Sequence, residues 1–403
     1  MAKVAILGFG VVGSGVAEVL SVNGDQIDRR IHSTVELKYI LDVRDFPDSP
    51  FASKIIHDFS IIENDPDVDI VVETIGGAKI AREFTQRALT AGKSVVTSNK
   101  ELVAKHGYEL MELAREHGVS YLYEASVGGG IPIIHPLKQC LAANEITEIT
   151  GILNGTTNYI LTRMIRSGLS FQEALKEAQA KGYAEQDPTA DVEGHDACRK
   201  ICILASLAFG RHIYPEQVST EGISGVGLAD VAYADSCGRK VKLLGRAIRR
   251  PDGRVTAFVA PHLVDGENPL AGVEDVFNAI TVKGNAIGDV MFYGRGAGKL
   301  PTASAVVSDV MEAARTMGQP KYLDWRPGGE DVTHPDDDVA SAWYVRGSSE
   351  PEALRKAFGE VSFLARAGAP AGETAVLTGV MTRGELEGRY PGDIATVFRV
   401  LED

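Results

Sequence analysis

Gly8-Phe9-Gly10-Val11-Val12-Gly13 is the stretch that decides the fold of the first third of this 403-residue chain. It has the spacing GxGxxG, follows an apolar run at residues 4–7, and leads into residues 11–20, whose apolar positions recur at helical spacing. A glycine loop between a strand and a helix is typical of dinucleotide binding. The first glycine allows the turn, the second lets the backbone approach a pyrophosphate, and the third lets helix pack on strand. The alternative is a glycine-rich turn without a ligand.

The next hundred residues continue the alternation of strand and helix. Strands are expected at residues 36–43, 68–74, 94–97 and 121–126, and helices at 81–91 and 101–117. This order predicts an α/β, Rossmann-type doubly wound parallel sheet with helices on both faces. We expect this dinucleotide-binding domain to span residues 1–132 and to be completed by a helix at 299–318.

The composition excludes several classes of protein. The chain is 44% hydrophobic and 24% charged, which is too apolar for a disordered protein. Its net charge of −14 argues against a nucleic-acid surface. It has no apolar run of roughly 18–20 residues and no apolar leader. The four cysteines show no CxxC, and the nine histidines lack a metal-ligand spacing. These features predict a cytoplasmic protein without a membrane partner.

The ribose end of the dinucleotide site has two candidate residues. An acidic residue that ends the second strand of such a fold usually holds the 2′-hydroxyl of NAD, and Asp42 lies there. Arg44 follows two residues later and is able to bind the 2′-phosphate of NADP, or is a solvated charge. The sequence leaves NAD and NADP both open.

A charged cluster marks the middle of the chain, which we expect to form an α+β domain over residues 133–298. Asp191 is expected to cap a helix on which Asp196 and Lys200 lie one turn apart, and Glu185 precedes this helix. The plain interpretation is a surface ion pair. The functional one is a lysine that passes a proton to an oxygen and is held by carboxylates.

Three further features lie next to predicted strand ends or helix starts. Lys100 follows the strand at 94–97, at the edge of the sheet where parallel folds bind ligands. The run of three glycines at 128–130 either turns carbonyl groups toward a monovalent cation or forms a hinge. The loop at 294–298 either caps a helix or forms a wall of the cofactor cleft.

The last part of the chain changes in composition. Residues 319–338 are rich in proline, glycine and aspartate and are expected to form a linker. The coarse order over residues 339–403 is strand, helix, strand, strand, short helix, strand.

Six stretches together resemble homoserine dehydrogenase of the monofunctional type. They are GFGVVGSG at 8–15, TSNK at 97–100, YEASVGGGIP at 123–132, NGTTNYIL at 154–161, KGYAEQDPTADVEGHDACRK at 181–200 and GRGAGKLPTASAVVSD at 294–309. The resemblance covers about residues 1–318. It implies NADP- or NAD-dependent interconversion of L-aspartate 4-semialdehyde and L-homoserine, in threonine, methionine and isoleucine biosynthesis.

The resemblance also implies roles for individual residues. Lys200 would donate the proton, and Lys100 would contact substrate oxygen and nicotinamide. Glu185, Asp191 and Asp196 would bind substrate. The matching cofactor positions are Gly8, Phe9, Gly10, Val11, Val12, Gly13, Arg44, Thr74, Lys100, Gly182, Glu185 and Gly298. The matching sodium site is the backbone at Glu124, Val127, Gly129 and Ile131.

The resemblance extends to assembly and regulation. It implies a homodimer, or a dimer of dimers, joined through the sheet of the middle domain. The tail at 339–403 resembles an ACT domain, a βαββαβ module that binds amino acids, so L-threonine is a candidate allosteric ligand. The usual Asp-x-x-Gly turn is replaced by Ser348-Ser349-Glu350-Pro351, which leaves threonine binding open.

Two other functions fit this sequence less well. Aspartate-semialdehyde dehydrogenase needs a nucleophilic cysteine in a polar setting, and Cys140 lies in an apolar, helix-like stretch. A non-enzymatic sensor has little reason to combine Lys100, Glu185, Asp196 and Lys200.

Overall fold

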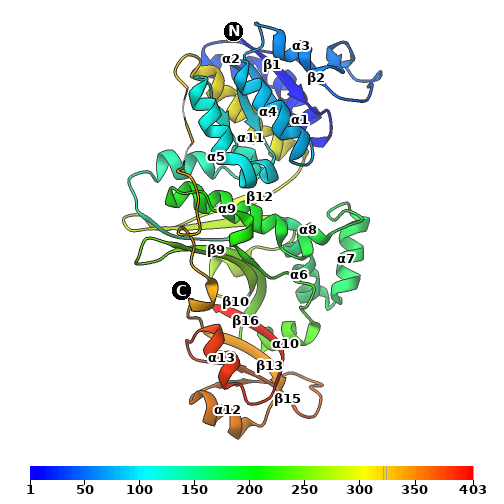
Figure 1. Cartoon of the computed structure of the whole chain (residues 1–403). Coiled ribbons are helices and arrows are strands. Elements are labelled where there is room, and N and C mark those ends of the chain that lie inside the picture. The colour runs from blue at the N-terminus through cyan, green and yellow to red at the C-terminus, as the bar shows by residue number, and fades with distance from the viewer. Residues whose placement is uncertain (321, 324, 403) are drawn as a thin grey trace. The chain divides into compact units, whose positions relative to one another are not determined.

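The computed structural model describes residues 1–320, 322–323 and 325–402, and its internal contacts divide the chain into two units (Figure 1). The first unit comprises residues 1–145, 202–215 and 294–329. The second comprises residues 146–201, 216–293 and 330–403. Residues 321 and 324 of the predicted linker and residue 403 of the predicted tail lie outside the described residues.

The first unit is built on a parallel sheet, as predicted. Its described strands are β1 (Ala2–Leu7), β2 (Val35–Leu41), β3 (Ile55–Ile56), β4 (Ile70–Glu73), β5 (Ser94–Thr97) and β6 (Tyr121–Leu122). Their order is β3-β2-β1-β4-β5-β6, and every neighbouring pair is parallel. The strand order reverses between β1 and β4, and sheets of this kind bind ligands at the carboxyl ends of the strands at that point.

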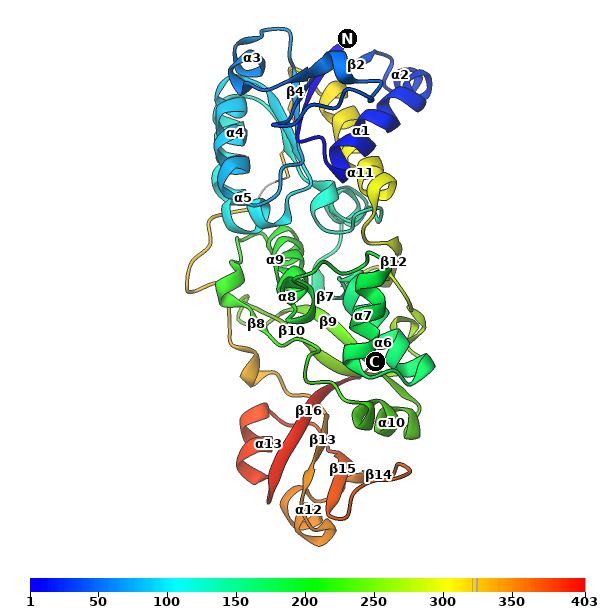
Figure 2. The ribbon, with the colours of Figure 1, turned by 90° about the vertical axis from the view of Figure 1, so that its right-hand side faces the viewer.

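Helices cover both faces of this sheet. They are α1 (Val11–Val22), α2 (Gly24–Ile31), α3 (Phe59–Asn64), α4 (Lys79–Thr90), α5 (Lys100–Glu116) and α11 (Lys299–Arg315). Although α11 comes late in the chain, it packs on α1, and the two lie side by side in Figures 1 and 2. A Cβ added at Gly15 would lie 2.9 Å from the Lys299 carbonyl oxygen and 3.1 Å from the Ala303 Cβ.

One predicted strand of the first unit is partly wrong. The strand expected at 121–126 ends at Leu122, and Glu124–Ser126 form a 3-10 turn. The Glu124 carboxylate accepts hydrogen bonds from the backbone N–H groups of Ile133, Ile134 and His135, at 2.6, 2.9 and 2.8 Å. These bonds tie the turn to the segment that follows the three glycines, so the chain leaves the sheet early.

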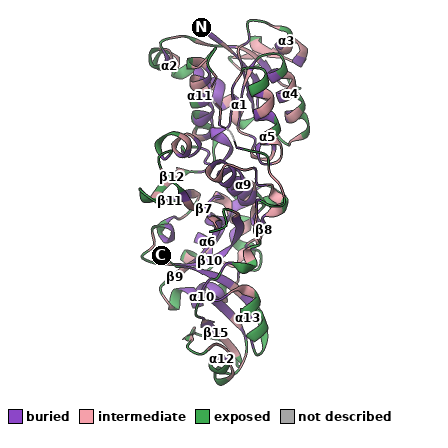
Figure 3. Ribbon diagram, turned by 60° about the vertical axis from the view of Figure 1, so that its left-hand side comes forward, coloured by how far each residue is buried: buried purple, intermediate pink, exposed green. Residues whose placement is uncertain are grey.

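The second unit contains a larger, mixed sheet, which agrees with the predicted α+β character. The order of its described strands is β12-β11-β7-β9-β10-β16-β13-β15-β14, with β8 paired to β10. The strands are β7 (Ile146–Ile152), β8 (Ser219–Thr220), β9 (Arg239–Arg249), β10 (Val255–Asp265), β11 (Phe277–Gly284), β12 (Gly288–Arg295), β13 (Trp343–Ser348), β14 (Ser362–Leu364), β15 (Glu373–Leu377) and β16 (Asp393–Leu401). Most of β9 and β10 is buried, as the purple strands of Figure 3 show.

The helices that begin in the second unit include the one that carries the charged cluster. They are α6 (Gly155–Ser167), α7 (Phe171–Ala180), α8 (Thr189–Val192), α9 (His195–Phe209), α10 (Leu228–Ser236), α12 (Pro351–Phe358) and α13 (Arg383–Arg389). The sequence Ser170-Phe171-Gln172-Glu173 predicts a capping box at the start of a helix, and the structure confirms it at the start of α7. The expectation that Asp191 caps the long helix is wrong, because Asp191 lies inside α8 and α9 begins after Gly194, whose φ is +80°.

The C-terminal segment has the predicted order of strands and helices, and it continues the large sheet. Parallel pairing of β16 with β10 joins His262–Val264 to Arg399–Leu401. One face of its strands packs on α12 and α13 through an apolar cluster that includes Trp343, Val376 and Leu386. On strand β13, Tyr344 and Arg346 bond instead to the buried carboxylate of Asp230 on α10.

No helix in the described part of the chain is long and apolar enough to cross a bilayer.

Candidate active site

The glycine loop has the geometry that a dinucleotide site requires. Gly8 has φ +89°, and a Cβ added at Gly13 would lie 1.9 Å from the Gly8 carbonyl oxygen, so a side chain fits at neither position. A Cβ at Gly10 would meet no atom within 4 Å, which leaves space for a ligand above the N-terminus of α1. The Thr74 hydroxyl donates to the carbonyl oxygens of Leu7 and Gly8, at 2.9 and 3.0 Å, and holds the loop against β4.

The two ribose candidates, Asp42 and Arg44, contact each other. The Asp42 carboxylate accepts the N–H of Phe9 at 2.7 Å and the Nε–H of Arg44 at 3.1 Å. Burial opposes ionisation, but the hydrogen bonds from Arg44 and Phe9 hold the pKa of Asp42 below its usual value. The Arg44 side chain remains 62% exposed and lies over the ring of Phe46. Asp42 therefore anchors the glycine loop, while Arg44 keeps an accessible cation.

A hollow of about 400 Å³ opens beside this loop. Phe9, Ser14, Glu18, Phe51 and Lys299 are among the residues that line it, and the Lys299 ammonium donates to the Glu18 carboxylate at 2.7 Å. Its lining combines aromatic and polar groups next to the N-terminus of α1, which fits one end of a dinucleotide. Gly298, with φ +123°, precedes Lys299 and begins α11.

Lys100 is the first residue of α5 and lies three residues after the carboxyl end of β5 at Thr97. Its neighbour Asn99 caps the helix, because the Asn99 side-chain oxygen accepts the N–H of Leu102 at 3.1 Å. The Asn99 amide also donates to the carbonyl oxygens of Ile75 and Gly77, at 3.2 and 2.8 Å. Three bonds from one side chain therefore fix the backbone that carries Lys100.

A buried glutamate supports this cap, and the sequence prediction missed it. Glu73 ends β4 and is fully buried. Its carboxylate accepts the Thr97 hydroxyl at 2.6 Å and the Ile75 N–H at 2.7 Å, and the Thr97 oxygen in turn accepts the N–H of Asn99 at 2.9 Å. Burial raises the pKa of Glu73 to about 7. The available signal was a single carboxylate at the end of an apolar run, Ile70-Val71-Val72.

In the second unit, Lys200 and Asp196 form a buried pair rather than a surface one. The Lys200 ammonium lies 2.8 Å from the Asp196 carboxylate and donates to the Leu153 carbonyl oxygen, also at 2.8 Å. The two residues are 7% and 3% exposed. The interpretation as a solvated ion pair is therefore wrong for these two residues.

Asn154 joins the carboxylates of this cluster and was also missed as a site residue. Its side-chain amide donates to Asp191 at 2.7 Å and to Asp196 at 2.9 Å. Its side-chain oxygen accepts the N–H of Thr157 at 2.8 Å and caps α6. The signal was the NGTTNYIL stretch, in which an asparagine directly precedes a helix.

Glu185 is the predicted substrate residue that the structure does not bring into this cluster. It is exposed. Its backbone carbonyl oxygen accepts a hydrogen bond from the side-chain amide of Gln179 at 3.1 Å. Gly182, three residues earlier, has φ +73° and follows the end of α7.

The glycine run of the first unit presents carbonyl oxygens. Those of Val127, Gly129 and Ile131 accept no hydrogen bond from any described residue. A Cβ added at Gly128 would lie 2.2 Å from the Ile131 oxygen, so only glycine fits there. Among the described residues, no group of three His, Cys, Asp or Glu side chains is arranged to hold a metal ion.

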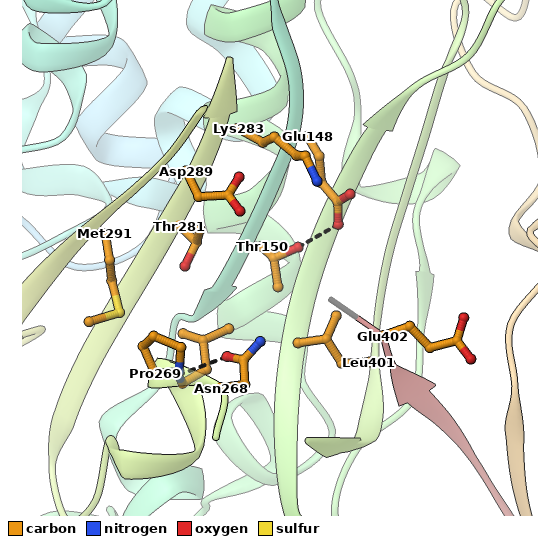
Figure 4. Close-up of a pocket in the computed structure, with 11 residues that line it drawn as sticks. Glu148, Thr150, Asn268, Pro269, Thr281, Lys283, Asp289, Met291, Leu401 and Glu402 are labelled. Carbon is orange, nitrogen blue, oxygen red and sulfur yellow. Dashed lines mark hydrogen bonds between the residues drawn. The ribbon is translucent and has the colours of Figure 1, made fainter. Parts of the chain in front are cut away.

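Another hollow, of about 400 Å³, lies on the sheet of the second unit and shares no residue with the predicted site (Figure 4). Thr150 on β7, Thr281 on β11 and Met291 on β12 line it, together with Asn268 and Leu401. Its lining includes residues of β7, β11, β12 and β16, and no residue of α9.

Comparison with known proteins gives a consistent result. A family model for the homoserine dehydrogenase NAD-binding domain matches residues 8–124, and a homoserine dehydrogenase model matches residues 132–311. The homoserine dehydrogenase of Synechocystis is 48% identical over 317 residues, which are 77% of this chain and 72% of that protein. That of Pseudomonas aeruginosa is 45% identical over 316 residues, 78% and 73% of the two chains.

Solved structures extend the similarity to the C-terminal segment. A homoserine dehydrogenase from Thiobacillus denitrificans superposes with a TM-score of 0.90 at 35% identity, covering 100% of this chain and 98% of the other. A hyperthermophilic archaeal homoserine dehydrogenase in complex with NADPH has a TM-score of 0.66 at 29% identity, covering 77% and 97%. On the agreement of both domain models, these relatives and these structures, the chain belongs to the homoserine dehydrogenase family.

Proposed function

We propose that Lys200 and Lys100 carry the chemistry of this NAD(P)-dependent homoserine dehydrogenase, which interconverts L-aspartate 4-semialdehyde and L-homoserine. The observation that carries the proposal is the buried Lys200–Asp196 pair, fixed by Asn154 and by the Leu153 carbonyl oxygen. A buried ion pair stabilises a fold little compared with apolar residues of the same volume. Its position within the motif of residues 181–200, of which Lys200 is the last residue, therefore supports a role in catalysis.

Lys200 would donate a proton to the substrate oxygen when the aldehyde is reduced. When bound, the nicotinamide supplies the hydride that reaches the aldehyde carbon. As negative charge develops on the oxygen, an ammonium group at hydrogen-bond distance stabilises it and then transfers a proton. The contacts with Asp196 and with the Leu153 carbonyl oxygen fix the orientation of the Lys200 ammonium, so the side chain would lose little more conformational entropy in the reaction.

Lys100 and three carboxylates would bind the substrate. Lys100, on the rigid first turn of α5, adds positive charge near the carbonyl oxygen and the nicotinamide. Asp191 and Asp196 provide acceptors for the ammonium and hydroxyl groups of homoserine. Glu185 is exposed, so its side chain is free to turn toward substrate or cofactor.

The cofactor would lie along Gly8, Gly10 and Gly13, with Phe9, Val11, Val12, Thr74, Gly182 and Gly298 beside it. Arg44 supports the use of NADP, because its guanidinium is accessible and the Asp42 carboxylate is already bonded to Phe9. NAD remains a substrate to be measured in parallel.

A sodium ion would be held by the backbone of Glu124, Val127, Gly129 and Ile131. Carbonyl oxygens are hard ligands of the kind that such cations prefer, and three of these four accept no hydrogen bond from the described residues. If the ion binds there, replacing sodium by choline lowers the unfolding temperature of the enzyme.

A homodimer would form through the sheet face of the second unit. Met291 and Tyr293 are 40% and 53% exposed on β12, and Met291 lines the hollow of Figure 4. Exposed apolar side chains on an uncovered sheet mark an interaction site. Light scattering gives the mass in solution, and M291R is expected to yield monomers.

The C-terminal segment would act as an ACT-like regulatory module. Its strand order β16-β13-β15-β14, with α12 and α13 on one face, supports this assignment. L-Threonine is the candidate effector.

One assay tests the main proposal. Reduction of NAD and of NADP is followed spectrophotometrically with homoserine, each with and without L-threonine. Activity supports the proposed site, the two rates give the cofactor preference, and loss with threonine supports the regulatory module. No reduction by protein that binds the dinucleotide would refute it.

A further inference from the structure

The loop at 220–223 packs against the turn that begins α9. The N–H of Ile223 donates to the carbonyl oxygen of Val192 at 2.8 Å. A Cβ added at Gly222 would lie 2.2 Å from that same oxygen and 2.5 Å from the Cα of Glu193. On the other side, a Cβ at Gly194 would lie 3.3 Å from the Glu221 carbonyl oxygen. Loop and turn are therefore in backbone contact, so one is not free to move without the other.

This turn sets the position of the buried pair. The carbonyl oxygen of Gly194 accepts the N–H of Cys198 at 2.9 Å, which is the first hydrogen bond of α9. Asp196 and Lys200 follow on the first two turns of the same helix. A helix transmits a displacement of its first turn to the side chains on its next turn, because its hydrogen bonds make it rigid.

Glu221 is the charged residue of the loop, and the C-terminal segment holds it. Its N–H donates to the carbonyl oxygen of Val259 on β10 at 2.8 Å. Its carboxylate bonds to the guanidinium of Arg383, the first residue of α13. The two side chains are 38% and 32% exposed, so water screens the contact only in part. Figure 2 shows α13 alongside β16.

A groove of about 440 Å³ separates the loop from much of the C-terminal segment. Glu221, Gly222 and Val226 line one side, and Arg383 and Ile394 line the other. Within the described part of the chain, the bond between Arg383 and Glu221 joins the two sides of this groove through opposite charges.

We propose that Glu221, held by Arg383, is a positioning residue for the Lys200–Asp196 pair, so that the C-terminal segment stabilises the catalytic arrangement. The inference rests on the proposed function of Lys200 and Asp196. It assigns the C-terminal segment a role in catalysis that needs no effector.

A charge exchange tests the proposal. It is made in E387Q, because Arg383 also bonds to Glu387 at 2.9 Å and R383E alone would place two carboxylates one helical turn apart. In this background, R383E or E221R is expected to lower kcat/KM for homoserine about ten-fold, a typical coupling between linked sites. The dissociation constant of the dinucleotide stays unchanged. The combination E221R/R383E restores kcat/KM.

The matched control is R389E on the same helix, made together with E385Q so that it does not place two carboxylates one helical turn apart. Arg389 pairs with Glu385 at 3.5 Å, and neither residue lines the groove. This variant is expected to leave kcat/KM unchanged. Single variants with unaltered kcat/KM, or a double variant that folds with the parental unfolding temperature and stays impaired, would overturn the proposal.

Amide hydrogen exchange separates this inference from the proposed function. Peptides that cover residues 192–200 are expected to exchange faster in R383E than in the E387Q parent and in the E385Q/R389E control. If the wild-type enzyme does not oxidise homoserine, the proposed function fails, and the exchange rates still report the coupling. Equal exchange in all three proteins would refute the coupling itself.

Discussion

Replacing Lys200 by methionine tests two effects of the buried Lys200–Asp196 pair, one on stability and one on turnover. Methionine keeps much of the apolar volume of the lysine stem and removes the ammonium. The Asp196 side chain, 4% exposed, then loses the cation 2.8 Å away. A buried charge that loses its partner costs roughly 3–5 kcal/mol of stability. The loss of a positioned proton donor lowers turnover by roughly 10²–10⁴, which is about 3–5 kcal/mol of activation free energy.

The double variant K200M/D196N distinguishes these effects. With both charges removed, no uncompensated charge remains, so most of the stability lost in K200M is expected to return. Turnover is not expected to return, because the proton donor is still missing. Urea unfolding measures the first quantity, and the rate of homoserine oxidation at saturating substrate measures the second.

The control for this experiment is K105M. Lys105 and Glu101 have the same i,i+4 spacing at 3.0 Å, but their side chains are 39% and 30% exposed. Such a pair contributes about 0.5 kcal/mol or less. Wild-type turnover in K200M would refute the proton-donor role, and equal stability of K200M and the double variant would refute the argument from burial.

Three further predictions concern other buried or accessible charges. Because burial raises the pKa of Glu73 from 4.5 to about 7, the native state holds this proton more tightly than the unfolded state. The wild-type protein therefore loses up to about 3 kcal/mol of stability between these pH values. E73Q lacks this loss, so urea unfolding should show that the stability of E73Q rises relative to that of wild type from pH 5 to pH 8. A stability difference that stays constant over this range would contradict the raised pKa of Glu73. R44A is expected to raise KM for NADP about ten-fold or more and to leave KM for NAD unchanged, and equal effects on both would remove Arg44 from the 2′-phosphate. D230A leaves Arg346 without the carboxylate that lies 2.7 Å from its Nε, so calorimetry should show a loss of roughly 3–5 kcal/mol of stability. Y344F removes only a hydrogen bond to Asp230 and should cost about 1 kcal/mol, so similar losses in the two variants would refute the buried network.

The sequence was sufficient where a local rule decides the structure. Gly8 and Gly13 were predicted from spacing, and the backbone angle of one and the contact distances of the other explain why only glycine fits. The capping box at Ser170 is a similar case, because all of its partners lie within four residues. Lys100 was placed at the carboxyl edge of the sheet by the order of strands alone.

The sequence was insufficient where a distant group decides. Asp191 has the residue type of a helix cap, but its carboxylate bonds to Asn154, 37 residues earlier, and the long helix begins four residues later. The strand at 121–126 ends early because Glu124 bonds to backbone N–H groups 9 to 11 residues further on. Spacing rules for helices and strands reach only a few residues and do not report such bonds.

The two lysines of the proposed site are held in ways that share one physical feature. Lys100 follows Asn99, whose side chain makes three hydrogen bonds. The Asn99 backbone N–H donates to the Thr97 hydroxyl oxygen, and that hydroxyl donates to the Glu73 carboxylate. Lys200 is bonded to Asp196, which Asn154 holds in turn. In both cases an asparagine at a helix start is connected to a buried carboxylate: Asn154 bonds to Asp196 directly, and Asn99 reaches Glu73 through Thr97. An asparagine side chain both donates and accepts, so it can cap a helix and hold a second group at once. In the proposed site, the backbone that carries Lys100 and the ammonium of Lys200 would therefore be positioned before substrate binds, so less entropy would be lost on reaching the transition state.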